Sequence, residues 1–102
     1  MSKPPFNQLL KQSDILVLVD FYADWCGPCQ TLSPIVQQAS KSFRGAIKVI
    51  KINVDKNKAI SEKFGIRSIP TLILFKKGKV IWRKAGLLTK RELITHLNNS
   101  IN

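Results

Sequence analysis

The sequence predicts one α/β domain built on a mixed β-sheet of four strands that is flanked by helices. A continuous apolar run over 15–22 is typical of a strand buried on both faces, as in parallel sheets. An apolar stripe at helical spacing over 32–43 and a β-branched run over 47–54 complete a strand-helix-strand unit. Two further strands, 71–75 and 80–82, indicate a hairpin around a Lys-Gly turn. We therefore expect residues 1–102 to form a single domain with one core.

The first expected element is a short amphipathic helix near the N-terminus. Phe6, Leu9 and Leu10 fall at positions i, i+3 and i+4, and this spacing predicts a helix that ends near Ser13. Its apolar side would cover one edge of the sheet. The first strand then runs from Ile15 to Tyr22.

The long helix after the first strand carries an apolar stripe at i, i+3, i+4, i+7 and i+11. The residues of this stripe are Leu32, Ile35, Val36, Ala39 and Phe43. Gly45 is expected to close the helix. Pro34 lies inside it and predicts a kink rather than a break, because the stripe continues on both sides. The next strand, 47–54, makes a βαβ unit, for which a right-handed crossover is expected.

The second half of the chain is expected to add two helices around the hairpin. Asn57 to Phe64 forms a short helix, and Gly65 is suited to the left-handed conformation at its end. Thr89 and Glu92, three positions apart, form a capping box that starts the last helix. The apolar side of that helix consists of Leu93, Ile94, Leu97 and Ile101.

The only two cysteines lie three positions apart in Trp25-Cys26-Gly27-Pro28-Cys29, directly after the first strand. One helical turn brings such a pair to about 5–6 Å at Cβ, close to what a disulfide needs, so the spacing indicates a redox pair. The alternative is half of a zinc site. Zinc takes about four N or S ligands, whereas this chain adds only one distant histidine, His96. The ligand count favours redox chemistry and predicts no metal.

The chain is strongly basic, with 17 Lys and Arg against 6 Asp and Glu and a net charge of +11. The basic residues are densest over 76–91, where they could steer acidic proteins or nucleic acid toward the domain. A solvated basic face is the favoured interpretation, because Trp82 is the one aromatic residue among them. The sequence has no signal-peptide pattern and no apolar run of about 20 residues, so we expect a cytoplasmic protein that inserts in no membrane.

Asp20 interrupts the apolar run of the first strand, six positions before Cys26. A carboxylate buried there costs several kcal/mol unless it is paired or takes up a proton. Asp20 therefore has a function, or it faces water at the end of the strand.

These motifs together resemble the thioredoxin family. The resemblance rests on Trp-Cys-Gly-Pro-Cys after a Val-Asp-Phe strand, Lys-Ile-Asn-Val-Asp over 51–55, Ile-Pro-Thr over 69–71 and a lone Gly86, in the family's order and spacing. It implies a thioredoxin fold and a protein-disulfide reductase. Two positions depart from the family pattern. Only five residues precede Phe6, so the family's opening strand is expected to be absent, and Tyr22 stands where relatives usually have Trp.

The position of Cys26 at a helix N-terminus predicts a lowered thiol pKa and makes Cys26 the nucleophile. Cys29 is then the resolving thiol, while Gly27 permits close approach of a substrate backbone and Pro28 stiffens the turn. The resemblance implies that Asp20 accepts the proton of Cys29 and that Lys51 partners this carboxylate.

The resemblance also implies a cis peptide bond before Pro70, in a loop where Ile69 pairs with the substrate chain. Trp25, Ile69 and Gly86, with Ala85 and Leu87 as weaker candidates, would form an apolar rim that docks partner proteins. The implied partners are a thioredoxin reductase and disulfide-containing client proteins, some of them acidic, and no cofactor is expected beyond the cysteine pair. We expect a monomer. A binding module that uses the rim or the basic face, and an oxidase or isomerase, are the competing classes.

Overall fold

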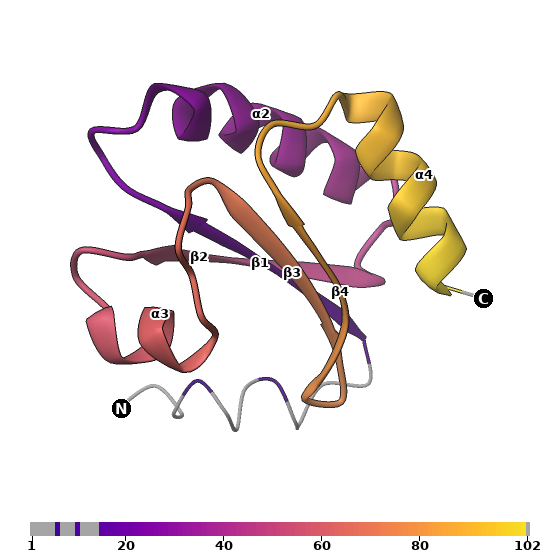
Figure 1. The fold of residues 1–102 in the computed structure, drawn as a ribbon. Coiled ribbons are helices and arrows are strands. Elements are labelled where there is room, and N and C mark those ends of the chain that lie inside the picture. Colours follow the sequence, from indigo (N-terminus) through magenta and orange to yellow (C-terminus); the bar gives the residue numbers. More distant parts are fainter. Residues whose placement is uncertain (1–5, 7–9, 11–14, 102) are drawn as a thin grey trace, which may run out of the picture.

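The structure is a computed structural model that describes Phe6, Leu10 and residues 15–101. Seven elements follow one another along this part of the chain (Figure 1). They are β1 (Leu16–Tyr22), α2 (Gly27–Lys41), β2 (Ile47–Asn53), α3 (Lys58–Lys63), β3 (Thr71–Lys76), β4 (Lys79–Ala85) and α4 (Lys90–Ile101). The three helices expected within residues 15–101 are all present.

The four strands form one mixed sheet in the order β2-β1-β3-β4. β1 pairs with β2 in parallel, whereas β1 with β3 and β3 with β4 are antiparallel. The parallel pair flanks α2, as expected for a strand-helix-strand unit. The predicted mixed sheet of four strands is therefore confirmed, and β1, which carries the residues before the cysteines, lies inside it.

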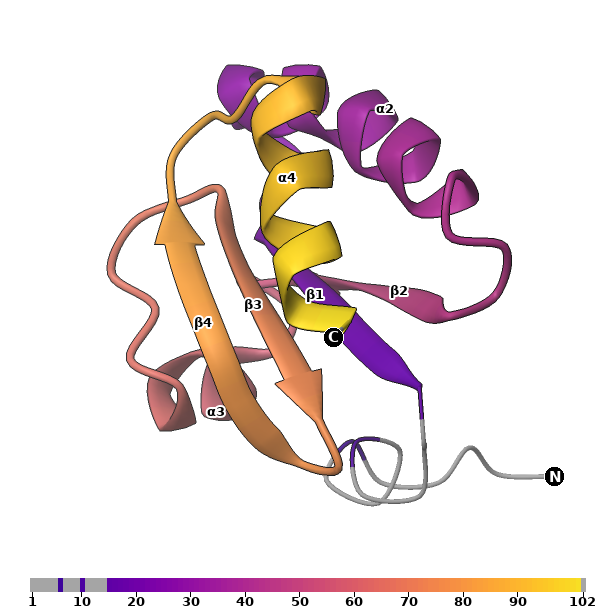
Figure 2. The ribbon, with the colours of Figure 1, turned by 90° about the vertical axis from the view of Figure 1, so that its right-hand side faces the viewer.

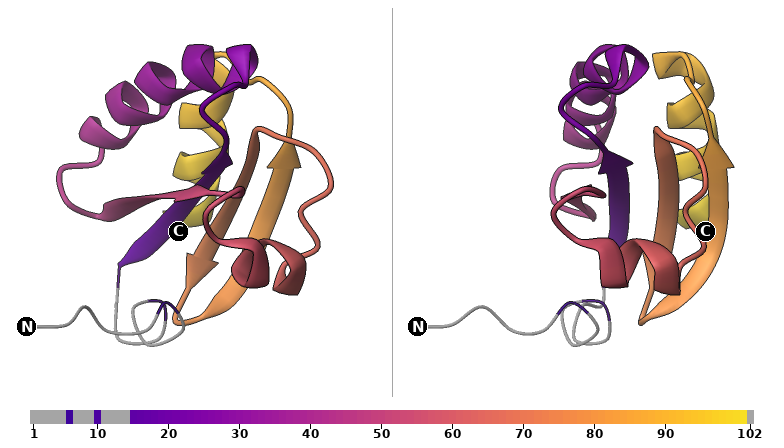
Figure 3. Two further views of the ribbon diagram at one scale, coloured as in Figure 1. Left: turned by 90° about the vertical axis from the view of Figure 1, so that its left-hand side faces the viewer. Right: turned by 60° about the vertical axis from the view of Figure 1, so that its left-hand side comes forward.

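Helices cover both faces of the sheet. Figure 2 shows α2 and α4 together, and the left view of Figure 3 shows α3 in front of the sheet with α4 behind it. One core cluster joins Leu16 and Leu18 of β1 to apolar residues of α2 and α4. A second cluster joins Val17 and Val19 of β1 to the α3 side, where Phe64 is packed against it. Successive residues of β1 thus face opposite layers, so a continuous apolar strand is needed.

Two boundaries differ from the sequence expectation by three residues or more. α2 ends at Lys41 rather than near Gly45, because the chain turns through Arg44 and Gly45 with φ of 45° and 85°. Phe43 still packs against the core from this turn, which explains why the apolar stripe continues past the helix. β4 extends to Ala85 rather than ending at Trp82, since its pairing with β3 continues although most of its residues are exposed.

The expected N-terminal helix and the expected absence of an opening strand lie outside the described residues, apart from Phe6 and Leu10. Both residues belong to the cluster on the α3 side of the sheet, where the Phe6 ring meets Phe64 at 5.9 Å. Within the described part of the chain, each helix is too short or too polar to cross a bilayer.

Candidate active site

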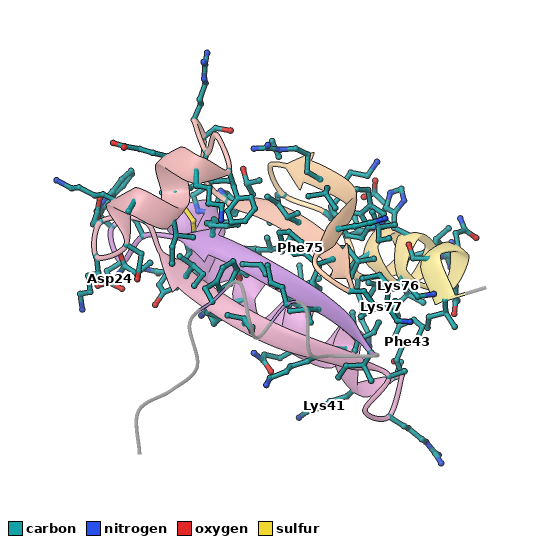
Figure 4. All side chains as sticks on the ribbon, turned by 90° about the horizontal axis from the view of Figure 1, so that it is seen from below. Asp24, Lys41, Phe43, Phe75, Lys76 and Lys77 are labelled. Atoms are coloured by element: carbon teal, nitrogen blue, oxygen red, sulfur yellow. A yellow bond between two sulfur atoms is a disulfide. The ribbon has the colours of Figure 1, made fainter. Side chains whose placement is uncertain are left out.

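The two cysteines lie after the end of β1, at the start of α2. Cys26 is the N-cap of α2, and Cys29 lies one turn into the helix. Their sulfur atoms form a disulfide with a Cα–Cα distance of 5.3 Å, and both residues are buried. Figure 4 shows this bond at the Asp24 end of the molecule, away from Lys76 and Lys77.

The start of α2 places positive partial charge next to the sulfur of Cys26. The backbone N–H of Cys29 donates to Cys26 Sγ at 3.2 Å, and no acidic residue lies in the first turn of this helix. Unpaired N–H groups and the helix dipole favour negative charge at this position.

Gly27 and Pro28 form the exposed part of the turn. A Cβ on Gly27 would meet no atom within 4 Å, so the space in front of the turn is open to another chain. Pro28 lies in the first helical turn, where its missing N–H removes no helical hydrogen bond.

The loop before β3 lies against the cysteines. The Ile69–Pro70 peptide bond is cis, which confirms the expectation from the family resemblance. Ile69 packs against the small cluster of Ala23, Cys26 and Cys29. The backbone N–H of Gly86, after β4, donates to the carbonyl of Pro70 at 2.8 Å. Residues far apart in sequence therefore meet at the disulfide, as the family resemblance predicts.

An apolar groove of about 170 Å³ runs beside Trp25 and Ile69. Val54, Ile66, Arg67 and Ser68 complete its lining, and these four residues lack any local pattern that marks them from sequence. The side chain of Trp25 is 72% exposed, and its Nε1 donates to Asp55 Oδ2 at 2.8 Å. The groove is thus bounded by a large apolar side chain that the protein holds in one orientation.

Asp20 is buried inside the sheet, so the alternative of a strand end facing water is wrong. The carboxyl is 1% exposed, and neither oxygen has a hydrogen-bond partner. Burial raises the pKa of Asp20 to about 6, and the positive charge of Lys51 partly opposes this rise. A carboxyl with this pKa exchanges a proton near neutral pH.

Lys51 faces Asp20 from the neighbouring strand, but its ammonium group binds elsewhere. The two residues are Cα partners in the parallel β1–β2 pair. Lys51 Nζ donates to Ser33 Oγ of α2 at 2.9 Å and lies 4.6 Å from the centre of the Tyr22 ring. Nothing in the sequence distinguishes Ser33 from an ordinary helix serine, so its part in this contact becomes visible only in the structure.

The basic run over 76–91 does not form one face. Lys76 and Lys79 pair with each other in the hairpin, at the end of the sheet opposite the Thr71–Ala85 pair beside the cis-proline loop. Arg83 is engaged with the carbonyl groups of Phe64 and Gly65. The run is therefore dispersed over both ends of β4 and the start of α4.

Trp82 is half-buried and packs against the core on the α4 side of the sheet. Its Nε1 donates to Ser100 Oγ at 2.9 Å, and its ring lies 5.9 Å from that of His96. Among the described residues, no group of three or more metal-ligating side chains comes together.

Comparisons with known proteins agree with this geometry. The thioredoxin family model matches residues 1–99. The chain belongs to the thioredoxin family. A thioredoxin from Rickettsia felis is 48% identical over 96 residues, which are 94% of this chain and 91% of the relative. A thioredoxin from Haemophilus influenzae is 43% identical over 96 residues, which are 94% of this chain and 90% of the relative.

A solved structure shows the same fold. A thioredoxin mutant from Halobacterium salinarum superposes with a TM-score of 0.82 and 36% identity, over 96% of this chain and 84% of that chain. As a thioredoxin family member with a Cys-x-x-Cys disulfide at the helix start, the chain is a thiol-disulfide oxidoreductase that reduces protein disulfides. Thioredoxins use the cysteine pair itself as the redox group, so Cys26 and Cys29 take that role here.

Proposed function

We propose that Cys26 is the nucleophile of this reductase. In the reduced protein its thiolate attacks one sulfur of a client disulfide, so that a mixed disulfide forms and the other client sulfur leaves as a thiolate. The position of Cys26 at the N-cap of α2 supports this role, because the Cys29 N–H already points at its sulfur. The open space at Gly27 leaves room for the approaching client backbone.

Cys29 completes the reaction as the resolving thiol. It gives its proton to Asp20 and attacks the sulfur of Cys26, which releases the second client thiolate and leaves the Cys26–Cys29 disulfide. Two electrons have then passed from the protein to the client. The observation that carries this proposal is the buried Asp20 carboxyl, which has no hydrogen-bond partner and whose pKa is raised to about 6. The Lys51 charge tunes that pKa from the neighbouring strand.

Client proteins dock on the apolar groove and on the loop around the cis-proline. Trp25 and Ile69 bound the groove, and Pro70 and Gly86 hold the loop beside the disulfide through their mutual hydrogen bond. An extended client segment that lies in the groove brings its disulfide to Cys26. The exposed side chain of Arg67 lines the groove, and the net charge of +11 favours clients with acidic surfaces.

The way in which the protein is re-reduced, its oligomeric state and its location are proposed from the redox role. A flavin-dependent thioredoxin reductase returns two electrons to the Cys26–Cys29 disulfide after each turnover. The protein acts as a single-domain monomer in the cytoplasm, where a reducing environment keeps a dithiol available. A second role as a binding module on nucleic acid receives less support, because the basic residues over 76–91 are dispersed and Trp82 is engaged with Ser100.

Replacement of each cysteine by serine tests the order of attack. A Cys29→Ser variant should accumulate a covalent mixed disulfide with an oxidised client, because the second step cannot occur. A Cys26→Ser variant, which keeps the other thiol, is the matched control and should form no adduct. Non-reducing gel electrophoresis followed by mass spectrometry detects the adduct, or its absence, in each variant. An adduct on Cys29 of the Cys26→Ser variant, with none on Cys26 of the Cys29→Ser variant, would reverse the assignment.

A further inference from the structure

Ser33 connects the active-site helix to the strand beside Asp20. It lies on α2 four residues after Cys29, so the two side chains share one face of the helix. Ser33 Oγ accepts a hydrogen bond from Lys51 Nζ at 2.9 Å, across 18 residues of sequence. Both residues line a groove of about 380 Å³ that also reaches Cys29 and Tyr22. The contact therefore lies on the wall of the same groove as the resolving thiol.

Lys51 has two competing positions for its ammonium group. In the structure the group is held by the Ser33 hydroxyl and by the face of the Tyr22 ring at 4.6 Å. The alternative partner is Asp20, the Cα partner of Lys51 on the adjacent parallel strand, where both side chains point to the same face. Both oxygens of Asp20 lack a hydrogen-bond partner. A buried carboxylate and a flexible ammonium group on adjacent strands would attract each other strongly. A third group therefore has to hold them apart.

We propose that Ser33 is a positioning residue that holds the Lys51 ammonium group in the groove and away from the Asp20 carboxyl. The carboxyl then stays free to accept the Cys29 proton. This inference rests on the proposed function of Asp20 as proton acceptor, and it adds the residue that keeps that acceptor unpaired.

Few groups near Asp20 can titrate or carry charge. On α2, Cys29 is the proposed proton donor and lines one groove with Lys51. Lys51 is the Cα partner of Asp20 on β2, and the apolar Leu72 is its Cα partner on β3. Burial and the charge of Lys51 are the two influences on the pKa of Asp20 in the described part of the chain. A movement of Lys51 is therefore the change to which the Asp20 carboxyl is most sensitive.

Replacement of Ser33 by alanine should release Lys51 and lower the pKa of Asp20. With the disulfide intact, so that no thiol titrates, ¹³C NMR of the labelled Asp20 carboxyl follows this proton alone. An opposite charge at contact distance should reduce the protonated fraction at pH 7 roughly tenfold. Ser33→Thr keeps the hydroxyl and should restore the original titration. Ser40→Ala, on the same helix but bonded only to the carbonyl of Gln37, is the matched control.

A double-mutant cycle decides whether Lys51 transmits the effect. In a Lys51→Met background, which keeps the side-chain stem but not the charge, Ser33→Ala should leave the Asp20 titration unchanged. An unchanged titration in the single Ser33→Ala variant, or an equal shift in the Lys51→Met background, would overturn the proposal. If Asp20→Asn leaves client reduction unaffected while Ser33→Ala still shifts the titration, the base role fails and the positioning role stands.

Discussion

Trp25 and Asp55 are joined by a hydrogen bond of 2.8 Å between the indole Nε1 and a carboxylate oxygen, although 30 residues separate them. The indole is 72% exposed and borders the apolar groove beside the disulfide. An exposed side chain of this size would otherwise sample several rotamers. The Asp55 carboxylate therefore holds one wall of the groove in which we propose that clients dock.

Replacement of Asp55 by alanine should weaken client docking more than it changes the chemistry. The freed indole must be ordered on binding, so we expect KM for a protein client to rise about threefold to tenfold, a cost of roughly 1 kcal/mol. The rate with a small aromatic disulfide, which needs no groove, should change little. Steady-state kinetics with both substrates provide the measurement. An equal loss with both would mean that Asp55 acts on the cysteines instead.

Replacement of Asp20 by asparagine should slow the resolution step near neutral pH. The amide cannot accept the Cys29 proton, and loss of a general base costs on the order of 10²-fold in rate. Single-turnover release of a client from its Cys26 mixed disulfide isolates this step. The deficit should shrink as the pH rises toward the ordinary thiol pKa, because Cys29 then ionises without help. Asp24→Asn, which alters an exposed carboxylate before the cysteines, is the matched control and should leave the rate intact.

The raised pKa of Asp20 also predicts how stability depends on pH. The folded protein holds this proton up to about pH 6, whereas the unfolded chain loses it near 3.8. Between these values the folded state binds more protons, so the contribution of Asp20 to the free energy of unfolding falls as pH rises. Each pH unit in that window costs about 1.4 kcal/mol, which amounts to about 3 kcal/mol by pH 7.

Denaturant unfolding of the wild type and Asp20→Asn across pH 4 to 8 tests this linkage. The variant has no carboxyl to ionise, so its stability relative to the wild type should increase by roughly 2.4 kcal/mol from the bottom to the top of this range, since the unfolded carboxyl is already partly ionised at pH 4. Other carboxyl groups titrate in both proteins and cancel in the difference. A difference that stays flat with pH would show that Asp20 ionises as easily in the folded protein as in the unfolded chain.

Thr89 and Glu92 form a capping box at the start of α4, away from the redox site. Glu92 N–H donates to Thr89 Oγ1 and Thr89 N–H donates to Glu92 Oε1, both at 3.1 Å, and these bonds lower the pKa of Glu92. Thr89→Ala should reduce the free energy of unfolding by about 1 kcal/mol, and Thr89→Ser should lose less. Client reduction by either variant should be unaffected at temperatures where the protein is folded, and thermal unfolding measures the loss.

Much of this fold can be predicted because its signals are local. The apolar run of β1 leaves few alternatives to a buried strand, and the Thr89–Glu92 box marks a helix start within four residues. The edge strand β4 is harder, because most of its residues are exposed and its length is determined by pairing with β3. The apolar stripe predicts an end of α2 that is too late, for a similar reason. Phe43 continues the apolar stripe from a turn, where packing and not helical hydrogen bonding holds it.

The sequence by itself determined the chemistry of the site: two thiols one helical turn apart, a helix start beneath them and a carboxyl in an apolar strand. These three features depend on residues close together in the chain, whose geometry follows from the regular backbone conformation of a helix or strand. Only the tertiary structure decided which distant side chains meet there. Lys51 binds Ser33 rather than Asp20, and Asp55 holds Trp25, because sheet register and helix packing bring these groups within hydrogen-bond distance. Contacts of that kind depend on the relative placement of whole elements, which no short stretch of sequence encodes.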